Sequence, residues 1–581
     1  MKKLLFSMAL SALTVVAFAQ NNAIHNQTGT SHVGTITQSG GDENNANVEQ
    51  AGHMQTGIVS QVGNKNNATV EQSVSIVEGS NVGVITQMGD ENRATVTQSE
   101  LRNIGQVVQV GNENSATIDQ ESNIGNRDED NMALILQEGN KNTASTLQDG
   151  TFNQAYVFQT DDENSAKVDQ RGDNNVANVT QEVFKNKAVV YQKGESQEAT
   201  VYQSGEENDA RVYQDRELVE GANVAFVEQV GNRNDAEAIQ TETGNLAVIL
   251  QHGDDNTAKI DQETNLGLRE EENVAFIDQK GTNHNATITQ EGDRHGAWVY
   301  QSNDNNTADV KQFGATNGEA WSSVAFVNQH GTNGNVDVTQ YAQYNAAAVD
   351  QGGNLNEANV EQLGGVANLA LIGQSGDENV AAISQSAGAM LNVAAIGQFG
   401  GENNSATVLQ SGETSWAAVG QLDNEGTSAM VQQTGTGNGA LTGQLQNHNS
   451  SLNIQQAGTD GFAGVAQVGS AWTGAGIYQY AGSSNAQAGI SQVNGFISGA
   501  SIHQWGGNGM EAQINQQDQN FFSNATILQS GNGMHQANIT QTAGMETGTL
   551  NTAITVQTGN VQQVSNVSQA GNGNLSVVNQ F

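Results

Sequence analysis

The stretch QVGNKNNATVEQ, residues 61–72, contains the repeating unit that decides the fold of this chain. Its Asn66, Ala68, Val70 and Gln72 lie two residues apart, and side chains with that spacing share one face of a β-strand. The segment before them contains Gly63 among polar residues, a composition typical of a tight turn. The stretch therefore predicts one turn followed by one short strand.

The same unit recurs along the chain, for example at residues 109–120 and 203–214. The glutamines that end successive units, from Gln27 to Gln580, define 46 intervals, of which 27 are 11 residues long and ten are 12. Each unit has only two inward apolar side chains and cannot fold alone, whereas stacked units bury a continuous core. The repeat therefore predicts a β-solenoid.

The inward Asn and Gln side chains need an explanation, because a buried amide without a partner is costly. In a stack, each amide lies about 4.8 Å from its equivalent one rung away and can hydrogen-bond to it. The alternative, exposed polar positions, is disfavoured because the same parity recurs in dozens of units. We predict a structural inward ladder that includes Gln61, Asn66, Gln72, Asn92, Gln98, Asn114, Gln120, Asn164, Gln170, Asn208, Gln214, Asn256 and Gln262.

Two observations favour two units per rung. The long intervals 72–87, 120–137, 214–229, 262–279 and 312–329 all begin on odd-numbered units, although the long interval 541–557 does not. The outward residue between Ala and Val is mostly apolar on one set of alternate strands and mostly polar on the other. We therefore predict an all-β parallel solenoid of two face-to-face sheets, with about 23 rungs of 22–23 residues; its hand stays open.

The apolar outward residues form a predicted stripe along one sheet. The inserted loops carry apolar residues, such as Leu218, Leu266 and Trp321, and precede strands of this stripe. We expect these loops to fold over the stripe; in the alternative, the stripe stays exposed for lateral association. The predicted stripe comprises Leu134, Tyr156, Phe226, Val248, Phe276, Trp298 and Phe326.

The composition excludes several classes of protein. The 581 residues contain no Cys, which excludes disulfide scaffolds, cysteine zinc sites and thiol chemistry. They also contain no Pro, which fits a chain whose amides donate to strand ladders. With 20 basic and 61 acidic residues, the formal charge of −41 argues against nucleic acid as a partner.

The charge is unevenly distributed along the chain. Residues 301–581 hold 17 acids and one base, and from residue 441 onward the charged side chains are Asp460, Glu511, Asp518 and Glu546. Outward charges resist strand stacking by repulsion. We therefore expect the C-terminal third to be the most amyloid-prone part.

The first residues have the pattern of a targeting segment. Lys2 and Lys3 precede an apolar run over residues 4–18, and Ala17-Phe18-Ala19 fits a small-residue cleavage site. We expect a signal peptide at 1–19, a short N-terminal segment at 20–26 and one repeat array at 27–581. No later run is apolar enough to predict a membrane span.

No motif in the sequence predicts catalysis, a metal site or a cofactor. The ten histidines, among them His25, His284 and His295, are scattered, and we expect them at surface or turn positions. Acidic turns at 89–92 and 161–164 are expected to be solvated or, alternatively, weak cation sites, because they lack the pattern of calcium β-rolls. The prediction is a protein that is not an enzyme.

The unit resembles the curlin repeat of curli, the extracellular amyloid fibres of Gram-negative bacteria. Residues 251–262, QHGDDNTAKIDQ, follow that family's pattern Gln-x-Gly-x-Gly-Asn-x-Ala-x-Val-x-Gln apart from its second Gly. Residues 529–541 keep the second Gly and extend the turn by one residue. The resemblance covers residues 27–581, but the large number of repeats, the long insertions and the charge depart from the family.

The resemblance implies a secreted structural subunit of curli-like functional amyloid fibres that supports biofilm matrix and cell adhesion. It also implies a curli-type outer-membrane secretion pore and a nucleator as partners, and a place on the surface of a Gram-negative bacterium. Whether the chain is a major subunit, a nucleator or a long fibre in its own right stays open.

The two ends of the array suggest how such fibres would grow. Repeats begin at Gln27 and continue to Gln580, and we expect no caps, so that terminal rungs stack head to tail on other copies. The alternative is a monomeric β-solenoid, either a surface adhesin or an ice-binding protein. Ice binding is disfavoured because the outward threonines, such as Thr69, Thr95 and Thr287, do not form a regular array.

Overall fold

The computed structural model describes residues 20–581 apart from 75–79, 123–129, 217–221, 243, 265–271, 315–321, 342, 387, 518–521, 543–549 and 572. The expected signal peptide and the apolar residues of the inserted loops therefore lie outside the described residues. The described chain is all β and forms a parallel β-solenoid of about 22 turns with two sheets. The predicted fold class is confirmed.

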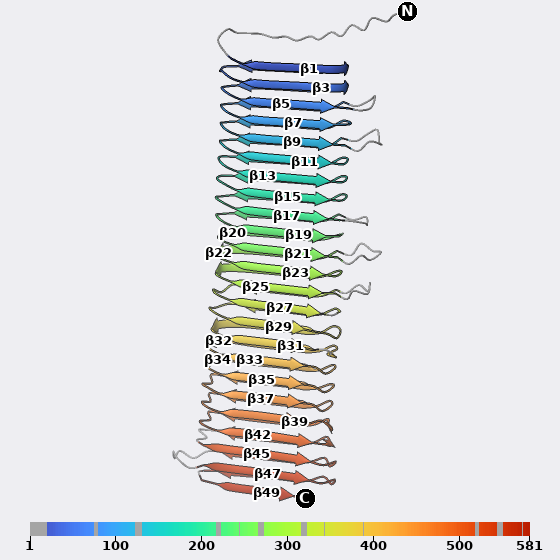
Figure 1. The fold of residues 1–581 in the computed structure, drawn as a ribbon. Helices are drawn as coiled ribbons and strands as arrows, with labels where there is room; N and C mark the ends of the chain where they lie inside the picture. The colour runs from blue at the N-terminus through green and yellow to red at the C-terminus, as the bar shows by residue number, and fades with distance from the viewer. Residues whose placement is uncertain are drawn as a thin grey trace, which may run out of the picture. The chain divides into compact units, whose positions relative to one another are not determined.

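The chain divides into two compact units, Met1–Asn283 and His284–Phe581. In the first unit, odd-numbered strands belong to one sheet, here called sheet A, and even-numbered strands to the other, sheet B (Figure 1). Its strands are β1 (Asn22–Thr30), β2 (Val33–Ser39), β3 (Asn45–His53), β4 (Thr56–Val62), β5 (Asn67–Ser73), β6 (Val82–Met88), β7 (Arg93–Ser99), β8 (Ile104–Val110), β9 (Ser115–Glu121), β10 (Met132–Glu138), β11 (Thr143–Asp149), β12 (Gln154–Thr160), β13 (Ser165–Arg171), β14 (Val176–Glu182), β15 (Lys187–Lys193), β16 (Glu198–Ser204), β17 (Asp209–Asp215), β18 (Val224–Val230), β19 (Asp235–Thr241), β20 (Leu246–Asp254), β21 (Thr257–Glu263) and β22 (Val274–Thr282).

The second unit repeats this arrangement. Its sheet A strands are β23 (Asn285–Glu291), β25 (Thr307–Phe313), β27 (Asn335–Tyr341), β29 (Glu357–Gln362), β31 (Val380–Gln385), β33 (Ser405–Gln410), β35 (Ser428–Gln433), β37 (Ser451–Gln456), β39 (Gly474–Gln479), β42 (Gly499–Trp505), β45 (Ser523–Ser530), β47 (Asn551–Thr558) and β49 (Leu575–Gln580). Its sheet B strands are β24 (Gly296–Asp304), β26 (Val324–Gln329), β28 (Ala346–Gln351), β30 (Leu369–Asp377), β32 (Val393–Glu402), β34 (Trp416–Glu425), β36 (Gly439–Leu445), β38 (Phe462–Val468), β41 (Gln487–Val493), β44 (Glu511–Gln517), β46 (Gln536–Thr542) and β48 (Val564–Ala570), and β40 (Ser483–Ser484) pairs separately with β43 (Gly507–Asn508).

Within each unit the strands pair in parallel with their equivalents one rung away, and the register places identical repeat positions side by side. In the first unit Val70 pairs with Val96, and in the second Val338 pairs with Val360. β1 begins at Asn22, inside the segment that we expected to precede the array, and pairs with β3 from its first residue. The stack therefore repeats every chemical feature of a unit at the spacing of the strands.

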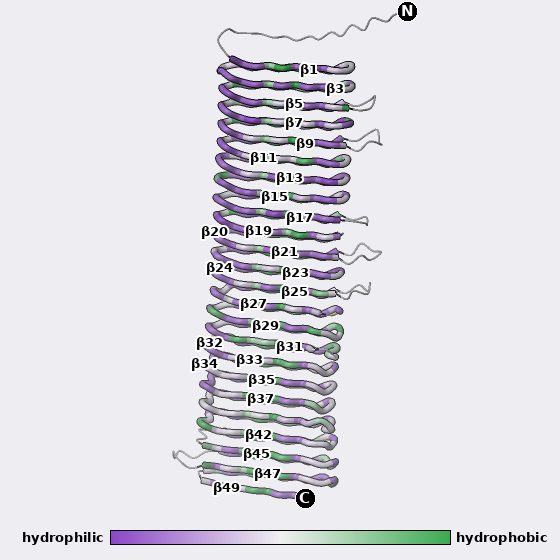
Figure 2. Tube along the Cα trace, in the orientation of Figure 1, coloured by the Kyte–Doolittle hydropathy of each residue, from purple (hydrophilic) through white to green (hydrophobic). Residues whose placement is uncertain are grey.

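The core lies between the two sheets and consists of small residues. Ala68 and Val70 are fully buried, and most of their equivalents on the interior strands are buried as well. In the first unit, Figure 2 shows short apolar segments within the strands, separated by mostly hydrophilic turns. Because the inward positions alternate with outward ones, each strand contributes only alternate side chains to this core.

The turns need two residues with positive φ. Gly63 has a φ of 116°, and a Cβ there would lie 2.0 Å from the carbonyl oxygen of Gly89 on the next rung, so only Gly fits. Lys65, with a φ of 54°, occupies the left-handed region at the position where the curlin pattern has its second Gly. Most turns of this chain therefore place a side chain where the family pattern has none.

Candidate assembly site: amide ladders and open ends

The inward glutamines form continuous hydrogen-bonded ladders. Gln72 Nε2 donates to Gln98 Oε1 at 2.7 Å on the next rung and to the carbonyl oxygen of Thr56 on sheet B at 3.0 Å. Gln72 Oε1 in turn accepts from Gln50 Nε2 at 2.9 Å. Such a glutamine therefore links neighbouring rungs and also links the two sheets, and the observed sequence of donors and acceptors runs in the same direction within each unit.

The inward asparagines bind mainly to the backbone of the turns. Asn66 Nδ2 donates to the carbonyl oxygen of Gly89 at 2.6 Å, and Asn66 Oδ1 accepts from the backbone N–H of Asn92 at 3.0 Å. Some direct bonds between side chains also occur, as from Asn114 Nδ2 to Asn92 Oδ1 at 3.1 Å. The asparagines thus hold each turn against the next, a role that strand parity does not predict.

The residues that we predicted for the inward ladder all lie between the sheets and are buried. They form two glutamine ladders, one per sheet, and an asparagine ladder at the turn before each strand. On sheet B lies Gln61, whose Nε2 donates to Gln87; on or beside sheet A lie Asn66, Gln72, Asn92, Gln98, Asn114, Gln120, Asn164, Gln170, Asn208, Gln214, Asn256 and Gln262.

Several histidines occupy the position of the inward Asn. His284, His295 and His535 precede the inward Ala by two residues and are at most 1% exposed. We expected surface or turn positions; these three lie at turns but are buried. Burial lowers the pKa of His295 from its usual value to about 4. The alternation of inward and outward positions in the repeat could have predicted that these three histidines face inward and are buried.

In the described part of the chain, the terminal glutamines on the two end strands of sheet A each lack one ladder hydrogen bond, an accepted one at the first strand and a donated one at the last. Gln27 Nε2 on β1 donates to Gln50 at 2.8 Å, and among the described residues no donor reaches Gln27 Oε1. Gln580 on β49 accepts from Gln557 at 2.8 Å, while its Nε2 donates, among the residues that the structure describes, only to the Val564 carbonyl at 3.0 Å. One end therefore presents an acceptor and the other a spare donor. The inward residues of both strands are also less buried than those of interior strands.

The predicted apolar stripe lies on the outer face of sheet B. Strand register places several members at neighbouring positions on adjacent strands: Leu134 beside Tyr156, Val248 beside Phe276, and Trp298 beside Phe326. In the first unit, Asn178 and Thr200 interrupt the row. Most members are half-buried, and Phe326 is 41% exposed. The loops expected to cover the stripe lie outside the described residues. The members are Leu134 (β10), Tyr156 (β12), Phe226 (β18), Val248 (β20), Phe276 (β22), Trp298 (β24) and Phe326 (β26).

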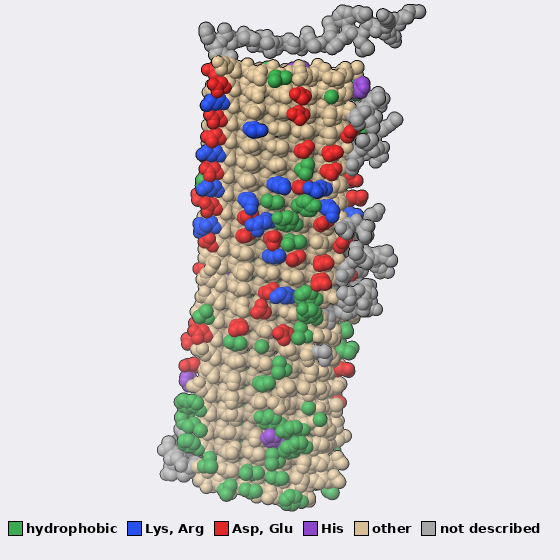
Figure 3. Space-filling model, in the orientation of Figure 1, with side chains coloured by type: hydrophobic (Ala, Val, Ile, Leu, Met, Phe, Trp, Pro, Cys, Tyr) green, Lys and Arg blue, Asp and Glu red, His purple; other side chains and the backbone are tan. Residues whose placement is uncertain are grey.

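One edge of the first unit carries a column of charges of both signs at the left-handed turn position. Lys65 Nζ lies 3.1 Å from Glu91, and Arg233 Nε lies 2.7 Å from Asp255. Figure 3 shows the blue and red side chains along this edge. Exposed pairs of this kind add little stability. The column comprises Glu43, Lys65, Glu91, Glu113, Lys141, Glu163, Lys185, Glu207, Arg233 and Asp255.

The acidic turns already use their carboxylates within the stack. Asp90 Oδ1 accepts from the backbone N–H of Asn64 at 2.7 Å, and Asp162 Oδ1 accepts from that of Asn140 at the same distance. Among the described residues, no group of three metal-binding side chains comes together. These carboxylates therefore bind the preceding turn.

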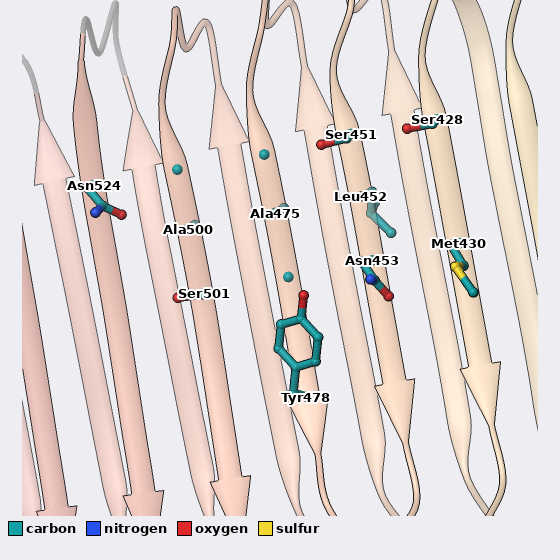
Figure 4. Close-up of a pocket in the computed structure, with 13 residues that line it drawn as sticks. Ser428, Met430, Ser451, Leu452, Asn453, Ala475, Tyr478, Ala500, Ser501 and Asn524 are labelled. Carbon is teal, nitrogen blue, oxygen red and sulfur yellow. The ribbon is translucent and has the colours of Figure 1, made fainter.

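The outer face of sheet A in the second unit is hollowed into a shallow groove of about 560 Å³ (Figure 4). Ser451, Asn453 and Ser501 line it, and the Tyr478 ring lies between Asn453 and Ser501. Tyr478 is the only titratable residue among those that line it, so the groove holds no pair of acid and base. The groove offers hydroxyl and amide groups but no catalytic chemistry.

A parallel β-solenoid with buried amide ladders defines a repeat protein whose structure is generated by one short motif. The curlin associated repeat matches six segments of the chain: residues 41–73, 139–172, 185–215, 231–263, 285–314 and 331–364. The chain therefore contains curlin associated repeats. No curated protein matches it. In the described part of the chain, no helix is long and apolar enough to cross a membrane.

Proposed function

We propose that this chain is the secreted structural subunit of curli-like functional amyloid fibres, whose copies join end to end. The observation that carries the proposal is the complementarity of the two open ends of the glutamine ladder. Placing β1 of one copy against β49 of another would bring Gln27 Oε1 to the spare donor of Gln580 Nε2. The junction would then repeat the bond found at every interior rung.

The backbone supports the same geometry. The outer sides of β1 and β49 have no neighbouring strand among the described residues, so their N–H and C=O groups are available to another chain. Unpaired strand edges are templates for pairing. A parallel junction between copies would satisfy these groups and bury the half-exposed inward residues, while the ladder direction would give the fibre a defined polarity.

The curlin repeat supports an extracellular, structural role rather than an enzymatic one. We include in the proposal that residues 1–19 direct export, that a curli-type outer-membrane pore secretes the chain, and that a nucleator starts growth. The fibre would lie on the surface of a Gram-negative bacterium and support biofilm matrix and adhesion. No cofactor takes part in the proposed assembly.

The end-to-end junction can be tested with one strand. Val578 on β49 faces inward and Val577 faces outward, where it is 54% exposed. A buried charge at a junction is costly, whereas an outward charge stays in water. We expect Val578→Asp, in the chain from Gln20, to reduce seeded fibre elongation at least tenfold, while Val577→Asp elongates as the wild type does.

Thioflavin T fluorescence with added wild-type seeds provides the measurement, and circular dichroism checks that both variants keep their β-structure. Equal elongation by the two variants would contradict growth through the β49 rung. Equal loss in both variants would also contradict it, because the outward side chain takes no part in the junction.

A further inference from the structure

Six consecutive sheet B strands of the second unit, β30, β32, β34, β36, β38 and β41, present an outer face without a charged side chain. This face, here called the apolar face, consists of the outward residues from Leu369 to Val493. Seven of its large apolar side chains are 38–51% exposed: Leu371, Val393, Phe399, Trp416, Leu422, Leu441 and Phe462. A surface of this kind is unusual on a chain with a charge of −41.

The charges of this region lie at its rim. Asp377, Glu402, Asp423 and Glu425 occur at the turn ends of β30, β32 and β34, outside the apolar face. Six rungs at about 4.8 Å and strands of seven residues at about 3.3 Å cover roughly 650 Å² of flat surface. A standard protein interface buries about 800 Å² per partner, and it combines an apolar centre with a polar rim.

The outward residues of the apolar face form parallel columns along the stack, some with small and some with large side chains. Strand register aligns four glycines, Gly373, Gly397, Gly420 and Gly443, into a furrow. The Phe399 ring lies close to the first two, but a Cβ added at Gly443 would meet no atom within 4 Å, so the furrow is open at this rung. Beside the furrow lies a ridge, the column Leu371, Ala395, Ala418 and Leu441.

We propose that the apolar face pairs with the same face of a second copy of this chain, about a two-fold axis parallel to the stack. Such an axis exchanges the two sides of the face, so the ridge of each copy lies opposite the furrow of the other. Leu441, which is 50% exposed, is then opposite Gly443 of the second copy. Both copies have the same rung spacing, so the match repeats at each of the four rungs from β30 to β36.

The alternative axis, perpendicular to the stack, places furrow against furrow and ridge against ridge, which leaves voids. The pairing with parallel axes also gives both copies the same polarity. Lateral pairing is therefore compatible with growth at the ends, but it does not depend on it.

The test uses the Val578→Asp chain from Gln20, in which the proposed end-to-end junction is blocked, so that remaining association is lateral. Gly443→Val adds apolar area but fills the furrow. Gly489→Val is the matched control: a Cβ there also meets no atom within 4 Å, but the residue lies outside the furrow, two rungs beyond Leu441 in the column next to it. Circular dichroism confirms that all three chains are folded.

Sedimentation equilibrium measures the dissociation constant of the dimer. We expect the parent chain to dimerise in the micromolar range, Gly443→Val to weaken the dimer about tenfold or more, and Gly489→Val to change it less than about twofold. A parent chain that is monomeric up to about 100 μM would overturn the proposal. Dimerisation by Gly443→Val as tight as that of the parent, or equal weakening by Gly489→Val, would overturn the ridge-and-furrow geometry.

If the parent chain dimerises but wild-type fibres do not elongate from their ends, the end-to-end proposal fails and the lateral one stands. The two proposals therefore fail independently.

Discussion

At the scale of single residues, each inward glutamine holds three neighbours. Gln98 accepts from Gln72 at 2.7 Å and donates to Gln120 at 2.9 Å and to the Val82 carbonyl at 3.0 Å. The alternation of the sequence predicts that these amides face inward. The bond to the opposite sheet could not be predicted, because it depends on how closely the two sheets approach.

Replacing one glutamine of the ladder should therefore weaken several rungs. We expect Gln98→Leu to destabilise β5, β7 and β9 by about 2–4 kcal/mol, because three buried polar groups each lose a hydrogen-bond partner. Hydrogen exchange of these strands, read by mass spectrometry, measures the loss. The control Thr97→Ala changes an outward residue of the same strand. Protection that is equal in the two variants would show that the ladder bonds do not hold the rungs.

The buried His295 predicts a pH dependence of stability. Its pKa is lowered to about 4 in the fold, against 6.5 in an unfolded chain. The unfolded chain therefore binds a proton first as the pH falls. Above pH 6.5 this histidine does not reduce the free energy of unfolding. As the pH falls from 6.5 through 4, the free energy of unfolding decreases by about 3 kcal/mol in total, which corresponds to the difference between the two pKa values.

His295→Asn restores the usual residue of the repeat and should remove this part of the pH dependence. Thermal unfolding of the wild type and of the variant at pH 7.5 and pH 5 measures it. The wild type should lose more stability on acidification than the variant. Identical losses would mean that His295 does not titrate as its burial implies.

At the scale of the strand and its turn, the repeat predicts the strands well but the turns only in part. Strand parity follows from side-chain alternation, which the residue types reveal directly. The second left-handed position of the turn is occupied by Lys65, Glu91 or Leu355. These residue types do not predict a left-handed conformation. It is set by the backbone bonds between successive turns, as from the Glu91 N–H to the Asn64 carbonyl at 2.9 Å.

This turn position predicts a stabilising substitution. Leu355 has a φ of 56° and is 49% exposed. Leu355→Gly should stabilise its rung by about 1 kcal/mol, because glycine relieves the left-handed strain of a residue with a Cβ. Leu355→Ala keeps the Cβ and serves as the control for the lost side chain. Chemical denaturation compares the two, and a glycine variant no more stable than the alanine variant would contradict the strain.

At the scale of the whole molecule, the fold and the ladder follow from the repeat, but the apolar face of sheet B does not. In the N-terminal half most intervals are 11 residues long, so equivalent positions of successive units can be aligned from the sequence alone. In the C-terminal half intervals of 11, 12 and 13 residues alternate, so Gly373, Gly397 and Gly420 align only once the register is known. Surface columns depend on that register rather than on any local pattern.

The uneven charge predicts where assembly is fastest. Residues 441–581 carry four charged side chains, whereas the N-terminal part carries most of the acids and nearly all of the bases. Repulsion between outward charges should slow stacking. We expect a 441–581 fragment to form fibres faster than a 27–300 fragment at equal concentration, as followed by thioflavin T. Equal or slower growth would mean that outward charge does not control the rate.

The central claim is that copies of this chain stack end to end. The most direct measurement is seeded growth of the chain from Gln20, followed by X-ray fibre diffraction of the product. We expect fibres that elongate from added seeds and give a meridional reflection at about 4.7–4.8 Å, the strand spacing continued across the junctions. A soluble, β-rich monomer that ignores seeds would contradict the claim and favour a monomeric surface adhesin.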